Sequence, residues 1–155
     1  MRVGAGFEVE RISTMVRGLQ AFKAASNPDM VPLRSGGSVV ETAAIVLGLA
    51  AVGGITLAGI RLSGTPRPPT WMALGHGIVA AVGLGILIYQ AATTSLPSLA
   101  LVALGVFLLA AVGGATMFFG FHLKEKALPI PFVFGHGLAA VAAYVLLLVA
   151  LFRTG

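Results

Sequence analysis

Four long apolar segments follow one another along the chain, and each is long enough to cross a membrane as a helix. They cover residues 39–60, 70–90, 99–121 and 130–152, and short polar or proline-containing segments separate them. About twenty residues of helix span a hydrocarbon core of about 30 Å. Strands are excluded because an open sheet cannot cross lipid and the segments lack the alternation of a barrel. The pattern predicts an all-α integral membrane protein with four transmembrane helices.

The first 38 residues have a different pattern. Large apolar residues recur there at helical spacing over residues 7–25, at Val9, Ile12, Val16, Leu19 and Phe22. Charged and polar side chains take the other faces, so we expect an N-terminal amphipathic helix that lies in the membrane interface or docks on a partner. A solvated arm is the alternative. No signal peptide is expected, since this part contains no long apolar core.

The second half of the chain repeats the middle at an offset of sixty residues. Gly75-His76-Gly77 returns as Gly135-His136-Gly137. Ala50-Ala51-Val52-Gly53-Gly54 returns as Ala110-Ala111-Val112-Gly113-Gly114, and Thr56 returns as Thr116. Each copy contains two predicted spans, so the copies share one orientation and are related by an approximate twofold axis along the membrane normal. This predicts two tandem parallel two-helix repeats, with both histidines on the same side and at the same depth.

The repeat suggests three parts. Residues 1–38 form the N-terminal arm and linker, residues 39–92 the first transmembrane hairpin, and residues 93–155 the second. The basic residues flank both sides of the predicted spans, so the charge pattern does not settle the orientation. An untranslocated N-terminal arm favours a cytoplasmic N-terminus, which would place the histidines toward the outer face.

Composition agrees with a membrane protein. The chain has 155 residues, of which 57% are hydrophobic and 10% charged, whereas a soluble domain carries about a quarter charged residues. The net charge of +5 comes from basic residues in loops and tails, which indicates membrane flanks and not a nucleic-acid surface. The chain has no cysteine, and this excludes disulfides, thiolate-bound iron–sulfur clusters and covalently attached c-type haem.

The two histidines are the candidate site, because an ionisable residue inside a span indicates function by default. Two neutral imidazoles related by a twofold axis can supply both axial bonds of one haem b, which makes His76 and His136 the expected metal ligands. Gly75, Gly77, Gly135 and Gly137 would let the macrocycle approach the backbone closely. The hydroxyls of Thr56 and Thr116 could accept a hydrogen bond from the second ring nitrogens. Arg61, Arg67, Lys124 or Lys126 could pair with the haem propionates.

A structural interpretation stays open beside this one. Glycines in membrane helices commonly allow close packing, and Thr and His side chains hydrogen-bond across helices. His122 has no counterpart, since Leu62 stands at its repeat position; it could bind a ligand, shuttle protons or simply lie at the interface. No carboxylate lies near either paired histidine in the sequence, and no nucleotide loop or Ser-His-Asp set is present. The sequence therefore contains no catalytic constellation, and at most electron transfer is expected of it.

The segment from Phe121 to Pro131, followed by Gly135-His136-Gly137, resembles a group of small bacterial four-span membrane proteins. This resemblance implies a multi-pass protein of the bacterial inner (cytoplasmic) membrane and carries no activity. The architecture is also loosely similar to four-helix cytochromes of the b561 type, which hold two haems on two histidine pairs. Only one pair is available here, so at most one such site is implied.

We therefore expect a small membrane-bound b-type cytochrome-like electron-transfer subunit with one bis-histidine haem, which exchanges electrons with quinone or a partner subunit. The alternative is a non-catalytic accessory or scaffolding subunit of a larger membrane complex. A small transporter is a third interpretation, but broken helices and buried charges, which mark transport sites, are missing from the sequence pattern.

Overall fold

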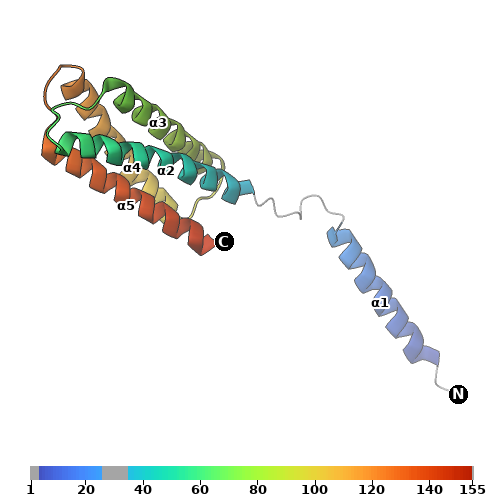
Figure 1. Ribbon diagram of the computed structural model, residues 1–155. Coiled ribbons are helices and arrows are strands. Elements are labelled where there is room, and N and C mark those ends of the chain that lie inside the picture. The colour runs from blue at the N-terminus through green and yellow to red at the C-terminus, as the bar shows by residue number, and fades with distance from the viewer. Residues whose placement is uncertain (1–3, 26–34, 155) are drawn as a thin grey trace. The chain divides into compact units, whose positions relative to one another are not determined.

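The computed structural model describes residues 4–25 and 35–154, and within these ranges it is helical with connecting turns and contains no strand. The helices run in the order α1, α2, α3, α4 and α5, with one π-helical turn, η2, directly after α4 (Figure 1). Their bounds are α1 Gly4–Ala25, α2 Ser35–Leu62, α3 Thr70–Thr93, α4 Ser98–Met117, η2 Phe118–His122 and α5 Ile130–Thr154. The all-α prediction is confirmed.

Four of these helices are long and apolar enough to cross a membrane. The apolar parts are Val39–Leu62, Thr70–Thr93, Ser98–His122 and Ile130–Arg153, each 24 or 25 residues long with a mean hydropathy between 1.9 and 2.3. Helices satisfy their own backbone hydrogen bonds, which is why they can lie in lipid. The four predicted spans are confirmed to within a few residues at each end, although α2 begins at Ser35, before the expected start at Val39.

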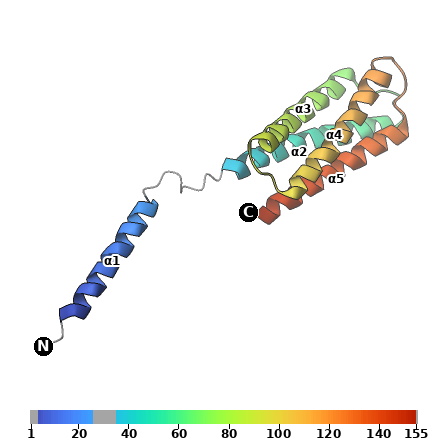
Figure 2. The ribbon, with the colours of Figure 1, turned by 180° about the vertical axis from the view of Figure 1, so that it is seen from behind.

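The described helices fall into two units, one containing α1 and the other containing α2 to α5. Within the second unit, α2 packs along α3 and α4 packs along α5, so each repeat forms a hairpin (Figures 1 and 2). The hairpins meet through α2 against α5 and through α3 against α4. The result is a four-helix bundle in which α3 and α5, the two helices that carry Gly-His-Gly, occupy corresponding places.

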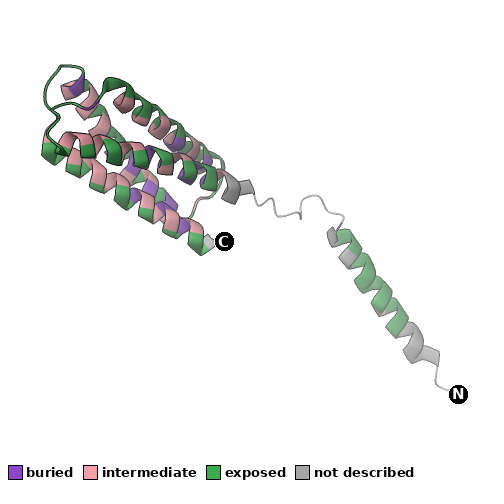
Figure 3. Cartoon of the chain, in the orientation of Figure 1, coloured by how far each residue is buried: buried purple, intermediate pink, exposed green. Residues whose placement is uncertain are grey.

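The burial of side chains repeats at the same offset as the sequence. The bundle core is built mainly from small residues, and most of its buried apolar positions occur in pairs sixty residues apart. Figure 3 shows where the buried residues lie along the helices. These pairs are Val40 and Ala100, Ala43 and Ala103, Leu47 and Phe107, Ala50 and Ala110, and Leu87 and Leu147. Two hairpins that bury the same positions present the same faces to each other, as a twofold axis requires. The predicted parallel repeat is therefore confirmed in the packing as well as in the sequence.

Large apolar side chains are plentiful on the outside of the bundle. Trp71 is 74% exposed, Leu109 72% and Phe152 83%. In water such a surface would aggregate, whereas in a bilayer it faces lipid tails. Trp71 is the second residue of α3, and an aromatic ring at a helix end suits the membrane interface.

Close packing between α2 and α3 depends on Gly83. A Cβ atom at this position would lie 2.8 Å from Leu47 Cγ and 3.2 Å from the Leu47 backbone nitrogen, whereas one at Gly85 would meet nothing within 4 Å. We expect Gly83→Ala to be less stable than the matched variant Gly85→Ala by about 1–3 kcal/mol, the usual cost of overpacking. Thermal unfolding of both variants in lipid nanodiscs measures the difference. Equal stability of the two would contradict this account of the α2–α3 contact.

Candidate functional site

His76 and His136 meet inside the bundle, although they come from different hairpins. His76 is the seventh residue of α3 and His136 the seventh residue of α5. Their ring centroids lie 6.1 Å apart and the ring planes are nearly perpendicular, at 88°. Because the pseudo-twofold axis exchanges the two residues, the midpoint between the rings lies on that axis. The sequence predicted that the two histidines lie at equal depth. The structure adds that their rings lie next to each other, in an edge-to-face arrangement.

Each ring makes one hydrogen bond to the main chain of the other helix in its own hairpin. Nδ1 of His76 lies 2.9 Å from the Ala50 carbonyl oxygen, and Nδ1 of His136 lies 2.7 Å from the Ala110 carbonyl oxygen. A carbonyl oxygen can only accept, so Nδ1 carries the hydrogen in both rings and donates it. In the neutral imidazole the lone pair is then on Nε2. The arrangement fixes one tautomer at both positions.

The glycine pairs on α2 and α4 explain how the rings reach these carbonyls. In an α-helix the Cα–Cβ bonds tilt toward the N-terminus, so side chains three and four residues later shield a given carbonyl. For Ala50 those residues are Gly53 and Gly54. A Cβ atom at Gly54 would lie 3.0 Å from Cε1 of His76, so the imidazole occupies the space that a side chain would fill.

The second hairpin repeats this arrangement. A Cβ atom at Gly114 would lie 3.1 Å from Cε1 of His136, and Gly113 and Gly114 follow Ala110 at the same spacing. The repeated Ala-Ala-Val-Gly-Gly sequence is therefore the acceptor half of the site, and Gly-His-Gly is the donor half. Sequence reasoning identified both motifs but did not join them through a hydrogen bond.

The two threonines expected to accept from the rings make other hydrogen bonds in this structure. The Thr56 hydroxyl donates to the Val52 carbonyl and the Thr116 hydroxyl to the Val112 carbonyl, each within its own helix. The ring hydrogen bonds expected from the threonines are made by Ala50 and Ala110 instead. A Cβ atom at any of the four glycines beside the histidines would meet nothing within 4 Å: Gly75, Gly77, Gly135 and Gly137. These glycines border open space and not a packed neighbour.

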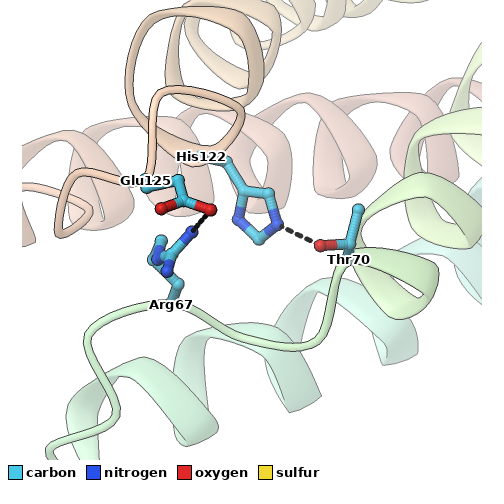
Figure 4. A network of polar contacts seen from close by, with 4 residues as sticks. All are labelled: Arg67, Thr70, His122 and Glu125. Atoms are coloured by element: carbon cyan, nitrogen blue, oxygen red, sulfur yellow. Dashed lines mark hydrogen bonds and ion pairs between the residues drawn. The ribbon is translucent and has the colours of Figure 1, made fainter.

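A second polar cluster joins the hairpins at the end of the bundle nearer the paired histidines (Figure 4). His122, the last residue of η2, is only 4% exposed, and its Nε2 lies 3.1 Å from the Thr70 hydroxyl at the start of α3. The ring stacks on Phe118, with centroids 5.5 Å apart. His122 is the last residue of this π-helical turn, and from there its ring reaches the start of α3.

Main-chain contacts strengthen the same junction. Arg61 Nε donates to the Leu128 carbonyl at 2.8 Å, and the Leu128 amide donates to the Pro66 carbonyl at 3.2 Å. Arg67 lies 3.9 Å from Glu125 in an exposed pair, which contributes little. The partner of His122 was not predictable from sequence patterns, since Thr70 and His122 are 52 residues apart. Arg61, expected at a propionate, holds the loop of the other hairpin in this structure.

Among the described residues, no group of three or more histidine or carboxylate side chains could hold a metal ion. The hydrogen bonds to Ala50 and Ala110 use Nδ1 of His76 and His136 and not Nε2. Comparison with protein-family models, with curated proteins and with solved structures found no match for this chain.

Gly54 and Gly59 lie on the same helix and allow a matched test of the ring position. A Cβ atom at Gly59 would meet nothing within 4 Å. We expect Gly54→Val to displace the His76 ring and to lower the free energy of unfolding by about 1–3 kcal/mol relative to Gly59→Val. Unfolding in nanodiscs measures the loss, and the ¹⁵N shift of His76 Nδ1 reports the broken hydrogen bond. An unchanged Nδ1 shift in Gly54→Val would contradict the fit of the ring against this glycine.

The His122–Thr70 contact is testable by a double-mutant cycle. We expect His122→Leu, which restores the residue of the other repeat, and Thr70→Val to be coupled by about 0.5–1.5 kcal/mol, the net value of one hydrogen bond. The cycle compares thermal unfolding of the two single variants, the double variant and the original protein. Purely additive effects would show that the contact does not stabilise the junction of the hairpins.

Proposed function

We propose that this protein is a small membrane-bound b-type cytochrome-like electron-transfer subunit that binds one haem b between His76 and His136. The observation that carries the proposal is the pairing of the rings on the pseudo-twofold axis, with both Nδ1 atoms engaged by carbonyl oxygens. Both Nε2 lone pairs then remain for a metal. A hydrogen bond from the distal ring nitrogen to a carbonyl orients a ligating histidine and raises its basicity.

The surroundings of the rings also suit a flat ligand. On α2 and α4 the residues beside the rings are alanine and glycine, namely Ala50, Gly53 and Gly54 and their repeats Ala110, Gly113 and Gly114. On α3 and α5 the flanking glycines border open space. Cofactors in helical bundles are commonly held by inward side chains of facing helices, as these histidines would hold the haem. The haem would supply a one-electron couple, and the protein would set its axial ligands and exclude water.

The depth of the site limits what the protein does alone. His76 lies six residues after the start of α3, which is about 9 Å along the helix axis. One haem near one end of the bundle does not carry electrons across the membrane. The proposed subunit therefore exchanges electrons at that side with quinone or with another subunit, in the bacterial cytoplasmic membrane.

A second candidate is an accessory or scaffolding subunit without a cofactor. The observation that favours it is the open space beside Gly75, Gly77 and Gly135, all of them exposed on the bundle surface. Glycine surfaces allow helices of a partner to approach closely. In that case the histidine–carbonyl hydrogen bonds would serve only to join helices within each hairpin.

Visible absorption spectroscopy distinguishes these functions. We expect the protein, purified after expression with added haem, to show the reduced-minus-oxidised spectrum of six-coordinate low-spin haem. His76→Ala and His136→Ala should each lose that spectrum or become five-coordinate, because each removes one axial bond. His122→Ala is the matched control, since it removes the third histidine of the chain and should keep the spectrum.

A colourless protein under these conditions would contradict the haem proposal. So would a spectrum that survives both single substitutions at the paired histidines. Copurification of stoichiometric membrane partners with a colourless chain would support the scaffolding function instead.

A further inference from the structure

α1 carries an apolar stripe that the described residues of its own unit leave exposed. Five large apolar residues of α1 are between 46% and 71% exposed: Ile12, Met15, Val16, Leu19 and Phe22. In Figure 3 the described part of α1 is coloured mostly as exposed. At 3.6 residues per turn they fall within an arc of about 120°. An apolar arc of that width is typical of a helix with one face in an apolar medium. Lys23 lies on the same side near the C-terminal end, where a long stem can carry the charge to the surface of a bilayer.

The opposite side of α1 is polar and makes its hydrogen bonds locally. The hydroxyls of Ser13 and Thr14 both donate to the Glu10 carbonyl, each at 2.9 Å. Arg17 contacts Ser13 through both its hydroxyl and its carbonyl. This face is therefore suited to water, and the apolar stripe is the face that needs a partner.

α1 is connected by a short linker to helices that are long and apolar enough to cross a bilayer. Residues 26–34 link α1 to α2, and nine residues cover about 30 Å at most when fully extended. The apolar part of α2 begins at Val39, four residues after the helix starts. The length of the linker therefore limits the distance between the C-terminal end of α1 and the bilayer that holds α2. A tether of this kind makes binding effectively intramolecular, so a modest affinity for lipid is sufficient.

We propose that α1 binds flat on the surface of the bilayer that its own bundle spans, with the stripe from Ile12 to Phe22 inserted among the lipid headgroups. The partner is the lipid itself, and the polar side with Arg17 remains in water. Helices with this division of faces lie in the interface plane with the apolar face about 5–10 Å deep. The inference does not depend on haem binding at His76 and His136.

The absence of cysteine from the sequence makes a labelling experiment direct. Single variants Ile12→Cys and Leu19→Cys place a spin label on the stripe, and Thr14→Cys and Arg17→Cys place one on the polar side. Position 14 is two residues after position 12, and position 19 is two residues after position 17. Two residues correspond to about 200° around the helix, so each polar-side label lies roughly opposite a label on the stripe. The full chain is reconstituted in vesicles of phosphatidylcholine and phosphatidylglycerol. Collision with oxygen, which partitions into lipid, is compared with collision with a water-soluble nickel chelate.

We expect the labels at positions 12 and 19 to favour oxygen at a depth of about 5–10 Å. The labels at positions 14 and 17 should favour the nickel chelate. A label at Leu109→Cys, on the exposed side of α4, should favour oxygen and show that the bundle is inserted.

Two results would overturn the proposal. Nickel accessibility at all four positions of α1 would mean that the helix is a solvated arm. Exclusion of both reagents from positions 12 and 19 would mean that the stripe packs on protein, either on the bundle or on a second copy of the chain.

Discussion

The hydrogen of an imidazole ring must find an acceptor when the ring lies inside a bundle surrounded by lipid, where water is scarce. In this protein the acceptor is a main-chain carbonyl, that of Ala50 for His76 and that of Ala110 for His136. A helix carbonyl already receives one bond along the helix, but its second lone pair is usable where no side chain covers it. The glycine pairs provide that access, so the packing of each hairpin and the tautomer of its histidine have the same cause.

The hairpin occurs twice, so the same histidine–carbonyl hydrogen bond is made twice and the two histidines come together. One hairpin alone would hold one histidine against its neighbouring helix. Two copies in the same orientation bury the same positions, from Ala43 and Ala103 to Leu87 and Leu147, and so bring the two rings together on the axis between them. The cluster of His122 and Thr70 breaks the symmetry at the nearby end, where Leu62 and Ile130 occupy the repeat positions. The His122–Thr70 contact therefore joins the two hairpins at the end of the bundle that contains the paired rings.

Much of the fold could be predicted from the sequence because lipid imposes a simple rule on it. Long apolar segments separated by turns form transmembrane helices, because helices satisfy their own backbone hydrogen bonds in lipid. The sixty-residue offset shows which residues of the two hairpins correspond. The hydrogen-bond partners were harder to predict. Thr56 and Thr116 were the plausible acceptors by residue type, but a threonine hydroxyl in a helix readily donates to the carbonyl four residues earlier, as both do. Every residue has a main-chain carbonyl, so residue type does not identify Ala50 and Ala110 as acceptors. The only sign in the sequence is the glycine pair that follows each of them and leaves the carbonyl accessible. The Thr70–His122 contact depends on the π-helical turn, which the apolar pattern does not reveal.

The central claim is that two imidazoles with the same tautomer meet between the hairpins. Solid-state NMR of the ¹⁵N,¹³C-histidine-labelled protein in lipid bilayers tests it most directly, with His122→Gln removing the third histidine signal. The account predicts a protonated Nδ1 and an unprotonated Nε2 at both residues, together with a ring-to-ring correlation between His76 and His136. Hydrogens on Nε2, or two rings without a mutual correlation, would contradict it.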